Sequence, residues 1–218
     1  GAGVLLQPSG LAVFRHLGVL DAAMALGAQV SALQGQLADG SLLVDHHYHD
    51  LNTEDFGLGM HRAALCDVLV SALPVQSIEW RMGHAVLGVT EQPDGVVVQH
   101  QVASGTLQDS QFDALLIANG AKSQLRPKDW VLLDRPYPWG AVWSILPECE
   151  TLDRQVLHQF YHGTQTMMGI LPTGAVPSQP QQRLSRVFWS IPTAQFATWG
   201  QQPEQITAWV ESVRQYWP

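Results

Sequence analysis

Charged residues are scarce in this sequence. They make up 14% of the 218 residues, whereas 46% are hydrophobic, which is typical of a folded globular chain and excludes an intrinsically disordered one. Only 11 residues are Lys or Arg, and the net charge is −8. Because a nucleic-acid-binding surface takes its affinity from basic side chains, we expect no nucleic-acid partner.

Long hydrophobic runs and a cysteine framework are also missing. No apolar stretch approaches the roughly 18 residues of a transmembrane helix, and no segment has the form of a secretory signal. The two cysteines, Cys66 and Cys149, suit a reducing compartment. We therefore expect a cytoplasmic protein without a transmembrane segment, for which peripheral membrane contact and the oligomeric state stay open.

The first 126 residues have a mixed α/β pattern. Helical spacing predicts helices over 9–27, with stop signals at Gly18 and Gly27, and over 61–73. The β elements predicted here are a strand near 41–51, a hairpin between 78 and 108, and FDALLIANG (112–120), an apolar strand buried on both faces of a sheet.

After Arg126 the sequence predicts a mainly antiparallel sheet with a helix. Four segments have the composition of strands: WGAVWSILP, VLHQFYHG, TMMGILP and RVFWSIP. A polar loop rich in Pro and Gln is expected near 172–185, and a helix near 203–217. The fold class is therefore α/β (α+β), with a domain boundary between residues 126 and 127.

Three short patterns are candidate sites. Arg62 begins a helix, where a cation is disfavoured unless an anion lies nearby; this anion is either a bound phosphate or carboxylate, or simply Glu54 or Asp55. Asn119 and Gly120 follow the apolar strand, either as a ligand-binding turn or as an ordinary one. The third pattern, three histidines between Asp45 and Asp50, does not have the spacing of a zinc site, so we expect no metal there.

The chain begins with Gly1-Ala2-Gly3, which looks like half of the dinucleotide fingerprint G-x-G-x-x-G. No strand precedes it, and Leu6 stands at the third glycine position. The fingerprint needs both a strand before it and that glycine, since the pyrophosphate binds at the helix that follows. These residues therefore do not predict a phosphate-binding loop.

Several segments, in this order, resemble one enzyme family. They are GAGVLLQPSGLAVFRHLGVLDAA, GLGMHRAALCDVL, FDALLIANGAKSQLR, PYPWGAVWSILP, MMGILPTG and RVFWSIP. Together they resemble the FAD-dependent aromatic hydroxylases, the flavoprotein monooxygenases of the para-hydroxybenzoate hydroxylase and ubiquinone-biosynthesis hydroxylase type. The resemblance implies an internal fragment of such a protein, because the family's G-x-G-x-x-G and a later G-D motif are not among these residues.

The resemblance also implies a function for each of two parts of the chain. Residues 1–126 would be a partial, Rossmann-like FAD-binding domain lacking its first βαβ unit, with some substrate-side strands near 41–51. Residues 127–218 would be a substrate-binding sheet domain, incomplete at its C-terminus. The family's bound FAD, with NAD(P)H and O2, hydroxylates a small aromatic or quinone-like substrate.

The same resemblance suggests residues for each ligand. The FAD-binding residues would be Arg62, Asn119, Gly120, Gly3 and Gln7, with Gly3 in a loop near the flavin ring. Asn119 replaces the family's usual Asp, so it keeps an acceptor oxygen but loses the charge. The wall of the substrate site would include Tyr137, Trp139, Trp143, Met167 and Met168. No catalytic side chain is assigned.

Two other functions stay open. The chain could belong to another flavin oxidoreductase on the same fold. A halogenase would be expected to have a lysine in its substrate channel, and it is disfavoured because the only lysines, Lys122 and Lys128, lie beside the Asn119 turn. It could also be a non-catalytic remnant that binds a partner through its sheet. The many tryptophans after residue 130 fit either an aromatic cavity or an ordinary core.

Overall fold

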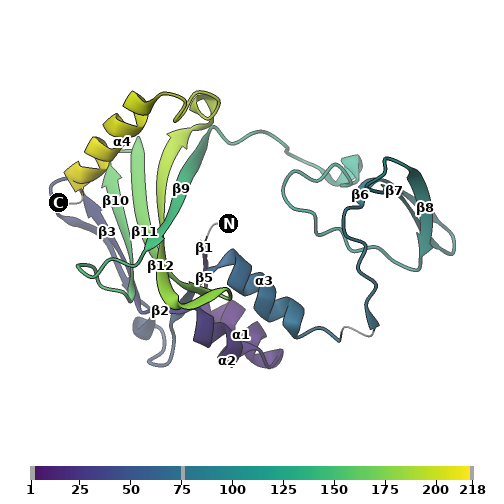
Figure 1. The fold of residues 1–218 in the computed structure, drawn as a ribbon, viewed down its shortest axis with the longest axis horizontal. Coiled ribbons are helices and arrows are strands. Elements are labelled where there is room, and N and C mark those ends of the chain that lie inside the picture. The colour runs from purple at the N-terminus through teal and green to yellow at the C-terminus, as the bar shows by residue number, and fades with distance from the viewer. Residues whose placement is uncertain (1–2, 75–76, 217–218) are drawn as a thin grey trace. The chain divides into compact units, whose positions relative to one another are not determined.

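The computed structural model describes residues 3–74 and 77–216, which belong to two compact units (Figure 1). One unit combines Gly1–Leu73 with Tyr137–Pro218, and the other is Pro74–Pro136. This division differs from the boundary expected between residues 126 and 127. The reason is strand pairing, since β3 (Ala32–Leu37) from the N-terminal part lies parallel to β10 (Val156–His162) from the C-terminal part.

A small sheet with helices forms the beginning of the first unit. Its antiparallel strands, in the order β1-β5-β2, are β1 (Gly3–Leu6), β5 (Gly57–His61) and β2 (Ala28–Val30). The helices are α1 (Pro8–His16), α2 (Leu20–Leu26) and α3 (Arg62–Ser71). Strand and helix share one apolar core, made by Leu11, Phe14, Val19, Ala23, Leu58, Met60, Ala64 and Val68.

The two helices predicted from the sequence are present, with one difference. The helix expected over 9–27 is interrupted between α1 and α2, where Gly18 has a φ of +71° that favours glycine. The helix expected over 61–73 is α3, which His61 caps by accepting a hydrogen bond at Nδ1 from the Ala63 amide (3.1 Å).

The larger sheet of this unit has six strands in the order β4-β3-β10-β11-β12-β9. Its further strands are β4 (Leu42–His47), β11 (Thr166–Val176), β12 (Gln179–Pro192) and β9 (Trp139–Pro147). All neighbours are antiparallel except β3 and β10. The four strands predicted after residue 126 are thus confirmed, and β4 from the 41–51 stretch pairs in the same sheet.

The prediction of a polar loop near 172–185 is wrong. Strands β11 and β12 continue through most of this segment and meet at a turn after Val176. Register shifts at Pro172 and Gly174 accommodate the proline, and Gly174 has a φ of +68°. The Pro and Gln residues therefore belong to an irregular hairpin, in which residues 179–183 form an exposed strand end.

The two sheets of this unit pack together at one end of β11. Val30, Leu157 and Leu171 form the buried contact between them, with Leu5, Leu33 and Tyr48 around it. A Cβ atom on Gly59 of β5 would lie 1.9 Å from the Pro172 carbonyl oxygen of β11. The backbones thus approach so closely that only glycine fits at position 59.

Helix α4 (Pro203–Tyr216) lies against the six-stranded sheet (Figure 1). It contributes Val213 to a cluster with Met168, Ile170 and Val187, which point to one face of β11 and β12. No helix among the described residues is both long and apolar enough to cross a bilayer.

The second unit is a three-stranded antiparallel sheet in the order β6-β7-β8. Its strands are β6 (Ala85–Gln92), β7 (Gly95–Gln101) and β8 (Leu107–Phe112), and the first two form the predicted hairpin. The buried strand predicted over 112–120 is wrong, because residues 113–118 form no strand and Leu116 is 88% exposed. An apolar run becomes a buried strand only beside partner strands, and this unit offers it none among its described residues.

Candidate functional site

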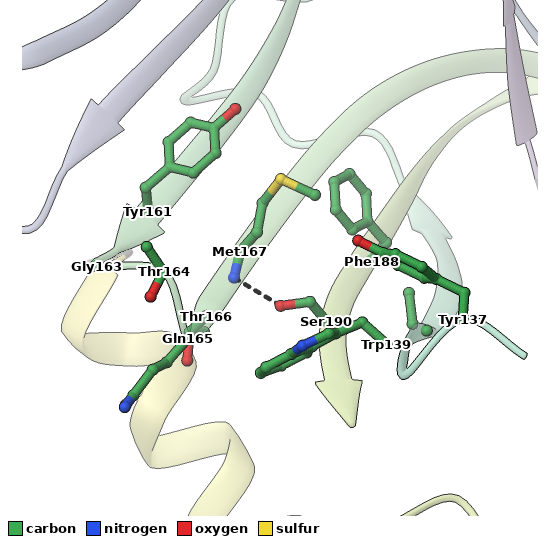
Figure 2. Close-up of a pocket in the computed structure, with 12 residues that line it drawn as sticks. Tyr137, Trp139, Tyr161, Gly163, Thr164, Gln165, Thr166, Met167, Phe188 and Ser190 are labelled. Atoms are coloured by element: carbon green, nitrogen blue, oxygen red, sulfur yellow. Dashed lines mark hydrogen bonds between the residues drawn. The ribbon is translucent and has the colours of Figure 1, made fainter. Parts of the chain in front are cut away.

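A cavity of about 540 Å³ opens on one face of the six-stranded sheet (Figure 2). On β11 the odd-numbered residues up to Leu171 point to this face, which packs against the small sheet at its Leu171 end and is open at its Met167 end. Strands β9, β10, β11 and β12 all contribute. The lining residues are Tyr137, Trp139, Gly140, Ala141, Tyr161, Gly163, Thr164, Gln165, Thr166, Met167, Phe188 and Ser190.

The walls of this cavity are aromatic and apolar, with hydroxyl groups among them. Figure 2 shows the side chains of Trp139, Tyr161, Met167 and Phe188 around the space. None of the lining side chains is charged at neutral pH. Such a surface suits a flat, uncharged ring that carries a few hydrogen-bonding groups.

Two hydrogen bonds fix polar groups at the wall. The Ser190 hydroxyl accepts from the Met167 amide (2.7 Å), so it holds the edge of β11 against β12 (Figure 2). The Tyr161 hydroxyl donates to Gln159 Oε1 (2.7 Å), and burial raises the pKa of this phenol. Tyr161 therefore stays protonated at neutral pH and presents a neutral, oriented hydroxyl to the cavity side of β10.

Arg186 lies beside this cavity, and sequence reasoning missed it. Its guanidinium stacks over the rings of Trp143 (5.5 Å) and Phe188 (5.6 Å) and donates from Nη1 to the Gly3 carbonyl oxygen (2.8 Å). Burial lowers its pKa, its Nε has no hydrogen-bond partner, and it pairs with no carboxylate among the described residues. The sequence feature that could have identified Arg186 is a single arginine in the otherwise apolar run RVFWSIP.

The predicted substrate residues divide between the two faces of the sheet. Tyr137, Trp139 and Met167 line the cavity, and Trp143 is on the same face but further along β9, over Arg186. The placement of Met168 beside Met167 on one wall is wrong. Neighbouring residues of a strand point to opposite faces, and Met168 is fully buried on the face that α4 covers.

Among the residues suggested for FAD, Arg62 lies at the start of a helix. It is exposed at the first position of α3 and has no ion pair with Glu54, Asp55 or another described residue. The bland explanation of a neighbouring carboxylate is therefore wrong. The Ala63 N–H beside it already donates to His61 Nδ1 (3.1 Å), so the unpaired Arg62 guanidinium is the group here that can bind an anion.

Gly3 and Gln7 fit a cofactor less directly. Gly1 and Ala2 lie outside the described residues, and Gly3 begins strand β1 instead of forming the expected loop. A Cβ atom on Gly3 would lie 2.2 Å from Thr173 Cγ2, so this glycine serves close packing. The Gln7 Oε1 atom accepts from the Tyr48 hydroxyl (2.7 Å), which leaves the Gln7 amide N–H groups for another partner.

Asn119 and Gly120 belong to the second unit, whereas Gly3, Gln7 and Arg62 belong to the first. Gly120 has a φ of +88° and open space around it, and its carbonyl accepts from the Ser123 amide (3.1 Å). Arg126 closes the turn by donating to the Ser123 and Ala121 carbonyls (both 3.3 Å) and to Asp134 (3.0 Å). The turn is thus an ordered, solvent-exposed loop with glycine at the position that requires it.

The histidines between Asp45 and Asp50 form local pairs only. His47 contacts Asp45 (3.2 Å), His49 contacts Asp50 (3.4 Å), and β4 ends at His47. Within residues 3–74 and 77–216, no group of three or more potential metal ligands is present.

Comparisons with known proteins found one curated relative and many solved structures. No protein-family model matches the sequence. A 3-amino-4-hydroxybenzoate 2-monooxygenase of Streptomyces cremeus is 33% identical over 130 residues, which are 58% of this chain and 32% of that protein. The chain therefore spans about a third of this curated relative's length.

Solved structures share the fold at lower identity. A tetrameric 2-methyl-3-hydroxypyridine-5-carboxylic acid oxygenase has a TM-score of 0.71 at 17% identity, over 99% of this chain and 54% of that one. Klebsiella pneumoniae HpxO, complexed with FAD and uric acid, has a TM-score of 0.66 at 22% identity, over 88% and 47%. The p-nitrophenol 4-monooxygenase of Pseudomonas putida has a TM-score of 0.70 at 14% identity, over 96% and 51%.

Proposed function

We propose that this chain, which is related to the FAD-dependent aromatic hydroxylases, carries the substrate pocket of a monooxygenase that hydroxylates a small aromatic or quinone-like compound with NAD(P)H and O2. The observation that carries this proposal is the cavity between Trp139, Met167 and Phe188 on the open face of the six-stranded sheet. A pocket of this size with aromatic walls binds flat rings by stacking and exclusion of water.

The substrate is an uncharged ring with polar substituents. Because no lining side chain is charged at neutral pH, a carboxylate deep in the cavity would lack a counter-ion. Hydroxyl groups of Tyr161, Thr166 and Ser190 and the Gln165 amide can bind ring substituents. An anionic group on the ring would instead reach toward Arg186, behind Phe188.

The parts of the first unit have separate tasks in this proposal. The small sheet with α1, α2 and α3 belongs to a Rossmann-like FAD-binding domain, and strands β3, β4 and β9 to β12 form the substrate sheet. Arg62 binds a phosphate group of FAD, and the Asn119-Gly120 turn of the second unit is a separate candidate for cofactor contact. Bound FAD supplies the oxidation chemistry, while the cavity residues bind and orient the ring and exclude water.

The test uses the full-length protein that contains this chain, loaded with FAD. NAD(P)H oxidation and product mass are measured with a panel of neutral phenols. Phe188→Ala is expected to raise the KM for a productive phenol by about tenfold, because a stacking surface of the cavity is lost. Phe112→Ala, on the second unit's sheet and outside the cavity, serves as the matched control and leaves KM unchanged.

Three results would contradict the proposal. A protein that oxidises NAD(P)H but leaves every ring unmodified would be another flavin oxidoreductase. One that neither holds flavin nor oxidises NAD(P)H would be a binding module. If Phe188→Ala and Phe112→Ala had equal effects on KM, the cavity would not be the substrate site.

A further inference from the structure

A second cavity, of about 340 Å³, lies on the opposite face of the six-stranded sheet, beneath helix α4. Met168, Ile170 and Val187 form its floor on β11 and β12, and Trp209, Val210 and Val213 of α4 form its roof. This cavity is distinct from the first one, because the strand residues that line it alternate with those that line the other face.

Two polar groups at this cavity lack partners. Ser185 is 6% exposed and lines the cavity, and its hydroxyl makes no hydrogen bond with any described residue. The Trp209 indole N–H is buried and also has no acceptor in the described part of the chain. Buried polar groups are nearly always hydrogen-bonded, so the unpaired Trp209 N–H indicates a missing acceptor, and the accessible Ser185 hydroxyl offers a second polar contact.

The cavity is a pocket of about 340 Å³ that opens to solvent, so water enters it when no ligand is bound. Ordered water needs two to four polar partners, whereas most of the lining side chains here are aliphatic or aromatic. An apolar molecule with one polar group matches the lining better than a cluster of water molecules.

We infer that this cavity is a binding site for a small planar aromatic molecule that carries one hydroxyl or carbonyl group. The Trp209 ring is held in place by edge-to-face contacts with Trp189 (6.3 Å) and Trp199 (5.8 Å), so it offers a fixed aromatic wall. The Met168 thioether faces it from the sheet, and sulfur contacts with aromatic rings are favourable. The polar group of the ligand binds the Ser185 hydroxyl.

The site is tested with two probes of the same shape, 1-naphthol and naphthalene. Binding to the purified protein is followed by quenching of tryptophan fluorescence, with calorimetry for 1-naphthol. Ser185→Ala is expected to weaken 1-naphthol by about fivefold, since one neutral hydrogen bond is lost, and to leave naphthalene unchanged. Val210→Phe fills the cavity from the helix side and is expected to weaken both probes at least about tenfold.

Both probes are measured in the Ala141→Phe background, because this substitution fills the first cavity, which also suits flat neutral rings. Thermal unfolding of each variant checks that it is folded. The inference is overturned if neither probe binds saturably in this background, or if adding Val210→Phe leaves their binding unchanged. It is also overturned if Ser185→Ala weakens the binding of 1-naphthol and of naphthalene equally. This comparison tests the inference even if Val210→Phe does not fold.

Discussion

Replacing Gly59 by alanine tests how the two sheets of the first unit are joined. Gly59 is in β5, the central strand of the small sheet, and is paired with Leu5 on one side and Ala28 on the other. The added Cβ atom would lie 1.9 Å from the Pro172 carbonyl oxygen and 3.4 Å from Leu171 Cδ1. Because two strands hold β5 in register, the clash must be relieved by moving β11.

The cost of this substitution follows from the distances. Relief to 3.0 Å requires a shift of 3.0 − 1.9 = 1.1 Å between backbone segments, and no flexible side chain is present to give way. Overpacking of a well-packed interior costs about 1 to 3 kcal/mol, and a backbone clash belongs at the upper end. For a chain of this size, about 3 kcal/mol corresponds to a fall in Tm of roughly 6 to 12 °C.

Thermal unfolding followed by circular dichroism measures this fall. Gly10→Ala is the matched control, because its Cβ atom would lie in ordinary contact, 3.9 Å from Leu6 Cβ, and alanine favours the helix. We expect Gly10→Ala to keep or raise the Tm slightly. If Gly59→Ala unfolds within about 2 °C of the wild type, the close approach of β5 and β11 is refuted.

Further predictions concern the cofactor and pH. In the full-length protein, Arg62→Ala is expected to weaken FAD binding by about tenfold or more, because a charge-assisted contact is worth about 1.5 to 3 kcal/mol; Arg15→Ala, another exposed and unpaired arginine, is the control in the same titration. Residues 1–218 alone are expected to bind FAD more weakly than micromolar, since Arg62 cannot supply the roughly 8 kcal/mol required, and a purified chain that carries flavin would refute this. Burial lowers the pKa of His158, so the unfolded state binds more protons below about pH 6.5. The free energy of unfolding should therefore fall as the pH drops from 7.5 to 5.5, and urea titrations should show a smaller fall in His158→Gln.

Local features of the fold could be predicted from the sequence. The helix over 61–73 was found from spacing, because its buried residues recur with the helical period, and the strands WGAVWSILP and RVFWSIP were found from composition. Three of the five predicted substrate residues, Tyr137, Trp139 and Met167, line one cavity. The helix and strand predictions depend only on neighbours along the chain, whereas the substrate residues were suggested by the resemblance to the hydroxylase family.

Features that depend on distant partners could not be predicted. The parallel pairing of β3 with β10 joins residues more than a hundred positions apart, and it moved the boundary between the compact units. Phe188 and Arg186 became site residues only through the register of β12 against β9. The apolar run before Asn119 has the composition of a buried strand, but burial requires partner strands that local sequence does not specify.

Oxygen transfer by the full-length protein is the most direct test of the proposed function. The protein, loaded with FAD, is supplied with NAD(P)H, isotopically labelled O2 and a neutral phenol, and the products are weighed by mass spectrometry. A ring product that has gained one labelled oxygen atom, formed more slowly at low substrate concentration by Phe188→Ala, is the predicted result. If NAD(P)H is consumed and labelled hydrogen peroxide forms, while no phenol tried gains a labelled oxygen atom, the proposed hydroxylase activity is contradicted.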